Sequence, residues 1–256
     1  GFDETRLSFG AEYAVNENLT IGLNGFAEDG SYEFDEFGVF PAGPTNGTPD
    51  ETGTREALGL RAYAKFSTGA WDHDIALSLY QIDRTADSPT VAAGTPYSSA
   101  FSGERIGAEY QTTGQISEQL KLSFGVDVKK ETAKYANLIT GSESATTSGA
   151  FIEAVVSPNS NLDITGTLRV DDHSDFGSYQ TGRLAFAYRP TDGMVWRGAF
   201  GTGYRAPSID ELYGNYPGAF PFVGNPALQP EESITAELGF DRTFANGAIL
   251  SGTVFH

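Results

Sequence analysis

Apolar and polar residues alternate along most of the chain. Between residues 161 and 170 the even positions are apolar or Gly, and the odd positions are Asn, Asp, Thr and Arg. The segments 119–128, 194–204 and 233–241 follow the same two-residue period. Successive side chains of a strand point to opposite faces, so this pattern predicts strands with one apolar and one polar face. We expect twelve strands, at residues 4–15, 18–28, 55–67, 71–84, 102–112, 117–132, 146–156, 161–171, 179–189, 193–204, 233–243 and 247–255.

Short and long connections alternate between these strands. The short turns lie near 16–18, 67–69, 112–116, 158–160, 189–193 and 245–247, and the long loops near 29–54, 85–101, 133–145, 172–178 and 205–232. Turns therefore lie at one end of the sheet and loops at the other, as in outer-membrane barrels. Strands of about ten residues are long enough to cross a bilayer when tilted. The sequence predicts an all-β, antiparallel, up-and-down transmembrane β-barrel, with residues 1–256 forming part of one barrel domain.

The side chains of the two faces support a barrel. The polar face carries charged residues with Gly and Thr, as a hydrated lumen does, and aromatic residues near strand ends predict interfacial girdles. A soluble β-sandwich, such as an adhesin, would also alternate and remains an alternative. The expected girdle residues are Tyr13, Phe66, Trp71, Tyr110, Tyr188, Trp196 and Tyr204.

Composition excludes several kinds of protein. The net charge of −18 argues against a nucleic-acid partner, which requires a basic surface. No run of apolar residues is long enough for a transmembrane helix. The chain contains no Cys, so disulfides, thiolate metal sites and thiol nucleophiles are excluded.

Two short motifs resemble catalytic or cofactor sites. Residues 171–175 read Asp-Asp-His-Ser-Asp, but a catalytic triad is assembled from separate elements and not from sequence neighbours. Gly201, Gly203 and Ala206 match a dinucleotide fingerprint, yet no helix and second parallel strand follow them. We therefore expect no enzyme activity.

The loop at 205–232 is the longest and holds the candidate binding residues. Aromatic side chains suit a large amphipathic ligand, although they also pack loops against themselves. Arg205 is expected at a strand end, paired with nearby acidic residues. The candidate ligand contacts are Tyr204, Tyr213, Tyr216, Phe220 and Phe222.

This region resembles the TonB-dependent outer-membrane receptors, in particular the cobalamin (vitamin B-12) receptor type. Residues 169–177 look like the preceding hairpin of that family. The matching segments are Tyr204-Arg205-Ala206-Pro207-Ser208, Glu211-Leu212-Tyr213, Gly224-Asn225-Pro226, Leu228 and Pro230-Glu231.

The resemblance implies a monomeric, 22-stranded barrel in the lipid of the bacterial outer membrane, with a plug inside it. This chain looks like an internal piece of about twelve strands that lacks the plug. The family implies import of cobalamin, with energy from the TonB complex acting through the plug. A siderophore (iron chelate) receptor of the same superfamily is the nearest alternative. A complete twelve-stranded outer-membrane pore or enzyme is the other.

An acidic segment raises the question of a metal. Between Glu28 and Thr54 there are seven acidic residues and no Lys or Arg. Such a run is typical of a solvated loop, and also of a site for a hard divalent cation. The resemblance implies calcium in the extracellular loops and places Phe34-Asp35 near a family Tyr-Asp ligand pair. Asp35 is therefore the candidate metal ligand, and no cofactor is otherwise required.

Overall fold

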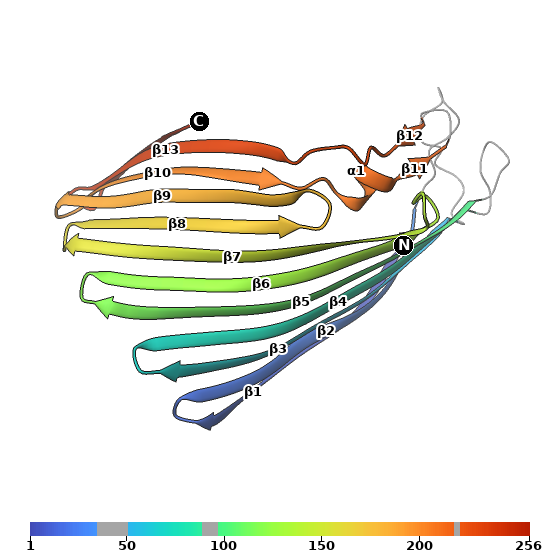
Figure 1. Cartoon of the computed structure of the whole chain (residues 1–256), viewed down its shortest axis with the longest axis horizontal. Coiled ribbons are helices and arrows are strands. Elements are labelled where there is room, and N and C mark those ends of the chain that lie inside the picture. Colours follow the sequence, from blue (N-terminus) through green and yellow to red (C-terminus); the bar gives the residue numbers. More distant parts are fainter. Residues whose placement is uncertain (35–50, 89–96, 218–220) are drawn as a thin grey trace.

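A computed structural model describes residues 1–34, 51–88, 97–217 and 221–256. Twelve strands form one antiparallel sheet in the order β1 to β10, then β13 and β14 (Figure 1). All twelve expected strands are confirmed. They are β1 (Phe2–Asn16), β2 (Leu19–Glu33), β3 (Thr52–Thr68), β4 (Trp71–Ser88), β5 (Tyr97–Ser117), β6 (Leu120–Tyr135), β7 (Ser142–Asn159), β8 (Leu162–His173), β9 (Gly177–Thr191), β10 (Met194–Arg205), β13 (Glu231–Thr243) and β14 (Ile249–Phe255).

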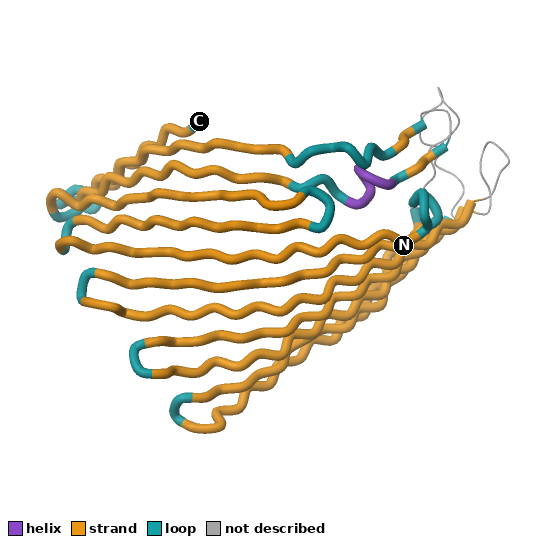
Figure 2. The backbone as a smooth tube through the Cα atoms, in the orientation of Figure 1, coloured by secondary structure: helices purple, strands orange, loops and turns teal. Residues whose placement is uncertain are grey.

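The turns gather at one end of the sheet and the loops at the other, as the sequence predicts. Figure 2 shows the tight turns on the left and the described connections of the other set further right. The β8–β9 connection, expected as a long loop at 172–178, is a tight turn of residues 174–176, because His173 is paired directly with Gly177. Three turns contain a glycine with positive φ, which other residues rarely adopt: Gly69 (61°), Gly193 (69°) and Gly247 (82°). Every strand is paired with its neighbour in sequence except across the β10–β13 connection, so the topology is up-and-down.

The strands extend further toward the loop end than the sequence predicts. β4 runs to Ser88 rather than residue 84, and β5 starts at Tyr97 rather than residue 102. Ser88 is paired directly with Tyr97, so the ladder continues almost to the tip of this hairpin. The added residues, 85–88 and 97–101, lack the regular apolar alternation by which strands are recognised.

Register places the apolar side chains of neighbouring strands on one face. Ile21 lies opposite Ala64, Ala64 opposite Ile75, Ile75 opposite Tyr110 and Tyr110 opposite Val126. No second layer covers this face within the described ranges, and Val126 keeps 54% of its surface exposed. The hydrophobic core of the described residues is accordingly small: Ala57, Ala76, Leu138, Ala145 and Leu212.

The other face carries ion pairs between strands. Arg61 lies 2.7 Å from Glu109, and Arg169 bridges Asp127 at 2.8 Å and Asp171 at 2.6 Å. These pairs join strands that are not neighbours in the sheet, such as β3 with β5 and β6 with β8. The polar face therefore combines Arg with Asp and Glu, as expected for a hydrated interior.

Aromatic side chains form stacks at the turn end of the apolar face. The His73 ring lies between Phe66, at 4.6 Å, and Tyr110, at 6.0 Å. Trp71 contacts Phe124 at 5.4 Å. Six of the seven expected girdle residues lie toward this end; Tyr204 does not, because it ends β10 at the loop end. No helix in the described parts of the chain is long and apolar enough to cross a membrane.

Candidate functional site

The connection between β10 and β13 is folded rather than irregular. It contains the helix α1 (Ile209–Tyr213) and a small hairpin of β11 (Asn215–Tyr216) and β12 (Phe222–Val223). The sequence predicts this long loop but not the helix within it, because five residues are too few to show a helical period. One signal was present: Ser208 and Glu211 form a capping box.

Four residues form a cluster, here called the clamp, which closes the base of this connection: Arg205, Ser208, Glu211 and Glu231. Arg205 donates to both oxygens of Glu211 at 3.1 Å and to Glu231 at 2.8 Å. The Ser208 backbone N–H donates to Glu211 at 2.7 Å. The expected pairing of Arg205 with nearby acids is thus confirmed. The clamp joins the end of β10, the start of α1 and the start of β13.

The clamp changes the ionisation of its carboxylates. Hydrogen bonds from Arg205, and then from Ser208, lower the pKa of Glu211 from 4.5 to about 2. Donors that bond only the ionised form stabilise it, so Glu211 stays charged through the ordinary pH range.

Above the clamp, the connection packs closely on itself. Leu212 is almost completely buried, with 1% of its surface exposed. A Cβ at Gly224 would lie 2.6 Å from the backbone carbonyl carbon of Leu212, so only glycine fits there. Asn225 donates its backbone N–H to the Glu211 carbonyl at 2.9 Å. The segments 211–214 and 224–225 are thus hydrogen-bonded and closely packed against each other.

The connection also docks on the loop between β6 and β7. Ile139 donates its backbone N–H to the Tyr213 carbonyl at 3.0 Å, and Asn215 donates to the Asn137 carbonyl at 2.5 Å. Leu138 and Gly214 form an isolated β-bridge between the two loops. Two loops distant in sequence are therefore fixed side by side above the sheet.

This docking closes a pocket of about 500 Å³ at the loop end, here called the mouth pocket. Its wall comes from the ends of β2, β4, β5 and β6, and its rim from α1 and β11. Phe101 faces Tyr135 across β5 and β6, with ring centroids 5.5 Å apart, and the Arg84 guanidinium lies 4.8 Å from the Phe101 centroid. The side chains with rings or charges are Tyr32, Arg84, Phe101, Tyr135, Asp210 and Tyr216.

Asp210 joins the rim of the mouth pocket to its wall. Tyr135 and Tyr216 donate their hydroxyls to the same oxygen of Asp210, at 2.5 and 2.7 Å. Burial, and then the hydrogen bond to Asp210, raise the pKa of the Tyr216 phenol. The Tyr216 phenol therefore remains a neutral donor, and the rings of Tyr135 and Tyr216 both line the pocket. Such a site can bind a large partly aromatic ligand.

The predicted ligand contacts divide into three groups. Tyr216 lines the mouth pocket, and Phe222 packs on it at 5.9 Å. Tyr204 stacks on Tyr179 at 5.0 Å instead, and Tyr213 turns its backbone to the β6–β7 loop; neither lines the pocket. Phe220 lies outside the described residues. Of the predicted set, the structure brings only Tyr216 and Phe222 together.

Sequence reasoning missed most of the mouth pocket. Tyr32, Phe101 and Tyr135 come from the loop ends of three strands, and Asp210 from α1. Aromatic residues at the loop ends of strands were a usable signal. The pairing of Tyr135 with Asp210, 75 residues away, was not visible without the docking of the loops.

The predicted metal ligand Asp35 lies outside the described residues and stays a prediction. Among the residues that the structure describes, no group of three or more His, Asp and Glu side chains is arranged to hold a metal ion. The contacts of the 171–175 motif are not those of a catalytic triad. The Asp175 backbone N–H donates to His173 Nδ1, and the Ser174 hydroxyl accepts from the Thr146 backbone N–H.

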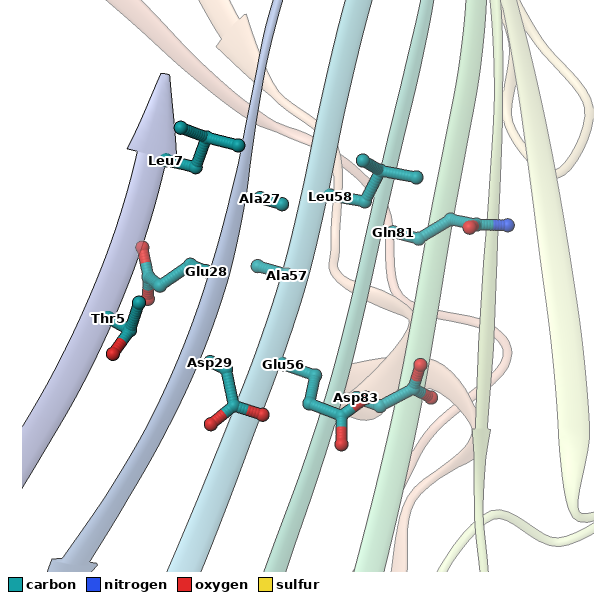
Figure 3. A pocket seen from close by; sticks show the side chains of 10 residues that line it. All are labelled: Thr5, Leu7, Ala27, Glu28, Asp29, Glu56, Ala57, Leu58, Gln81 and Asp83. Carbon is teal, nitrogen blue, oxygen red and sulfur yellow. The ribbon is translucent and has the colours of Figure 1, made fainter.

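A second hollow, of about 400 Å³, marks a boundary on the apolar face. Figure 3 shows Leu7, Ala27 and Leu58 along one side of it. Asp29 lies opposite Glu56, and Glu56 opposite Asp83, on β2, β3 and β4. Like charges directly opposite repel each other unless water screens them. The apolar band therefore ends at this acidic row.

Comparison with known proteins agrees with this architecture. The family model for "TonB dependent receptor-like, beta-barrel" matches residues 1–256. The chain is 24% identical over 229 residues to the vitamin B12 transporter BtuB of Photobacterium profundum, covering 90% of this chain and 34% of that protein. It is 32% identical over 142 residues to an iron-regulated outer membrane virulence protein of Vibrio cholerae, covering 53% and 22%. The chain thus spans about a third of the BtuB relative.

Solved structures share the fold. The ferric enterobactin receptor PfeA of Pseudomonas aeruginosa, as a G324V mutant, superimposes with a TM-score of 0.80 at 13% identity, covering 99% of this chain and 42% of that one. The siderophore receptor PirA of Acinetobacter baumannii gives 0.72 at 15% identity, covering 98% and 47%. The all-β fold and the outer-membrane location predicted from the sequence are confirmed, and the family is one of receptors rather than enzymes. The chain belongs to the TonB-dependent receptor β-barrel family.

Proposed function

We propose that this chain is part of the barrel wall of a receptor that binds a large, scarce ligand outside the cell and imports it. The mouth pocket carries the proposal, because it lies at the loop end and two docked loops hold its rim. The remaining strands, a plug within the barrel and coupling of that plug to the TonB complex belong to the same proposal. A wide barrel with a polar interior needs such a plug.

Cobalamin is the ligand that we propose first. The relatives named as vitamin B12 transporters support it. The pocket also supports it, because rings of Tyr32, Phe101, Tyr135 and Tyr216 stand beside the exposed hydroxyl groups of the β5 end. A large amphipathic ligand requires apolar surface with a few placed polar groups.

An iron–siderophore chelate is the second candidate, and Arg84 is the observation that favours it. Arg84 lies over Phe101 and forms no ion pair with any described residue. Other arginines of the same face, such as Arg61 and Arg105, are paired with carboxylates. A cation next to aromatic rings suits an anionic, aromatic chelate. The relative named as an iron-regulated protein agrees with this alternative.

Isothermal titration of the intact receptor tests the proposal. With cyanocobalamin we expect saturable heat at one equivalent, unchanged by the substitution Arg84→Gln. Binding of ferric enterobactin instead, weakened by Arg84→Gln, would move the assignment to the second candidate. Heat from neither ligand would overturn both.

A further inference from the structure

The apolar face carries another hollow, of about 580 Å³, between the aromatic stacks at the turn end and the acidic row of Asp29, Glu56 and Asp83. One register row forms its lower side: Leu23, Ala62, Leu77, Ala108 and Val128 lie opposite one another on successive strands β2 to β6. Large and small side chains alternate along this row. The small side chains of Ala62 and Ala108 create the depression. Leu77, with 61% of its surface exposed, lies between them.

The hollow faces the bilayer. Its row lies on the same face as the aromatic stacks, two residues above Tyr110 and Val126 in the direction of the loops. Since the family places the barrel in the outer membrane, this face contacts lipid and not water. An acyl chain is therefore the apolar group available to fill the hollow.

Lys130 stands at the upper rim of the hollow. It follows Val128 by two residues on β6, so it shares that face, and it lies opposite Ile106. Its side chain is exposed and has no ion pair with any described residue. A lysine stem can lie along apolar surface while its ammonium reaches the membrane interface. Lys130 thus presents an unpaired cation where the acyl-filled hollow meets the headgroup region.

The surrounding charges restrict an anion to this position. Gln81 donates to Glu104 at 2.9 Å, and Asp83 lies further along the same face of β4. These carboxylates repel an anionic headgroup from β4 and β5. Charge complementarity and the shape of the hollow therefore favour an amphiphile whose phosphate lies at Lys130 and whose acyl chain lies in the hollow.

We propose that this hollow binds one acyl chain of an outer-leaflet lipid whose phosphate pairs with Lys130. The site depends on the outer-membrane location and not on the ligand proposed for the mouth pocket. Its test therefore fails or succeeds separately from the titration with cobalamin.

The experiment uses intact receptor, stripped of lipid in alkyl maltoside and titrated with dioleoylphosphatidylglycerol, with bound lipid counted by native mass spectrometry. We expect the receptor to retain one equivalent of this lipid. Lys130→Gln should weaken the affinity for the lipid about fivefold, which is the effect of one cation at a membrane surface. Ala108→Leu, which fills the hollow from an outward-facing position, should remove it. Lys134→Gln is the matched control, because Lys134 lies on the same face of β6, beyond the hollow.

Dioleoylglycerol, with the same chains and no phosphate, should not be retained. Equal lipid affinity in Lys130→Gln and Lys134→Gln, or equal retention of the two lipids, would overturn the proposal. Retention unchanged by Ala108→Leu would also overturn it. Each variant is first checked for the heat-dependent gel shift of a folded barrel, and Lys130→Gln alters only an exposed side chain.

Discussion

Arg205 and Glu211 face each other through two parallel N–H···O bonds of 3.1 Å, six residues apart in the chain. This paired geometry fixes both planar groups, which a single point charge would not do. The same guanidinium reaches Glu231 at the start of β13. The long connection between β10 and β13 is therefore closed at its base, and its rim is held over the mouth pocket.

Removal of the clamp should open this connection without unfolding the sheet. Exposed ion pairs are individually weak, so Arg205→Ala should raise the ligand Kd only about fivefold and leave the thermal unfolding of the barrel unchanged. Hydrogen exchange should accelerate at the Leu212 amide, which donates to the Ser208 carbonyl.

The control for Arg205→Ala is Arg189→Ala. Arg189 pairs with Asp163 at 2.7 Å at the turn end of the sheet, away from the mouth pocket. Arg189→Ala should leave both the ligand affinity and the hydrogen exchange of the Leu212 amide unchanged. An equal effect of the two substitutions would contradict a local role for the clamp.

The docked loop should depend on pH through Glu211. Its pKa is lowered in the folded protein, so its stabilising contribution is complete above the ordinary value of 4.5 and is lost as the pH falls toward about 2. Protection of the Leu212 amide, corrected for the intrinsic exchange rate, should fall across this window.

Glu211→Gln should flatten this pH dependence, because glutamine does not titrate. In Glu211→Gln, the hydrogen-exchange protection of the Leu212 amide should already be low at pH 4.5 and should change little as the pH falls toward about 2. The same steep loss of protection in Glu211→Gln would show that another group controls the loop.

Gly224 should tolerate no side chain. A methyl group there would meet the Leu212 backbone at 2.6 Å, and such overpacking costs about 1–3 kcal/mol. We expect Gly224→Ala to reduce protection of the Asn225 amide and to weaken ligand binding. Gly166→Ala is the control, since nothing lies within 4 Å of a Cβ at that position.

Tyr216 should contribute more to ligand binding than Tyr213. Truncating an aromatic side chain at the centre of a binding site costs about 2 kcal/mol or more, so Tyr216→Ala should raise Kd at least about thirtyfold. Tyr213→Ala removes a side chain that does not line the pocket and should change Kd little. A larger effect at Tyr213, measured by titration calorimetry, would place the ligand outside the mouth pocket.

The sequence was sufficient for the strands because their signal is local. In β8 the alternation of Leu162, Ile164, Leu168 and Val170 with polar residues appears directly in the chain and survives in the sheet. Strand ends were less visible, since the loop ends of β4 and β5 do not alternate regularly between apolar and polar residues.

The site was only partly visible because it depends on contacts between distant segments. The aromatic residues near the longest loop suggested Tyr216 and Phe222 correctly as neighbours, but Tyr204 stacks elsewhere. Asp210 acquires its position from the docking of two loops, through bonds such as Asn215 to Asn137. No periodicity or spacing in the sequence reports such a contact.

Ligand protection of the mouth pocket tests the central claim most directly. The chain has no cysteine, so Ser99→Cys introduces a single thiol into it at an exposed position lining the pocket. In the intact receptor, saturating cyanocobalamin or ferric enterobactin should slow maleimide labelling at this position. Labelling of Ser67→Cys, at the turn end, should not change. If a bound ligand leaves labelling of Ser99→Cys as fast as in the free receptor, the mouth pocket is not the ligand site.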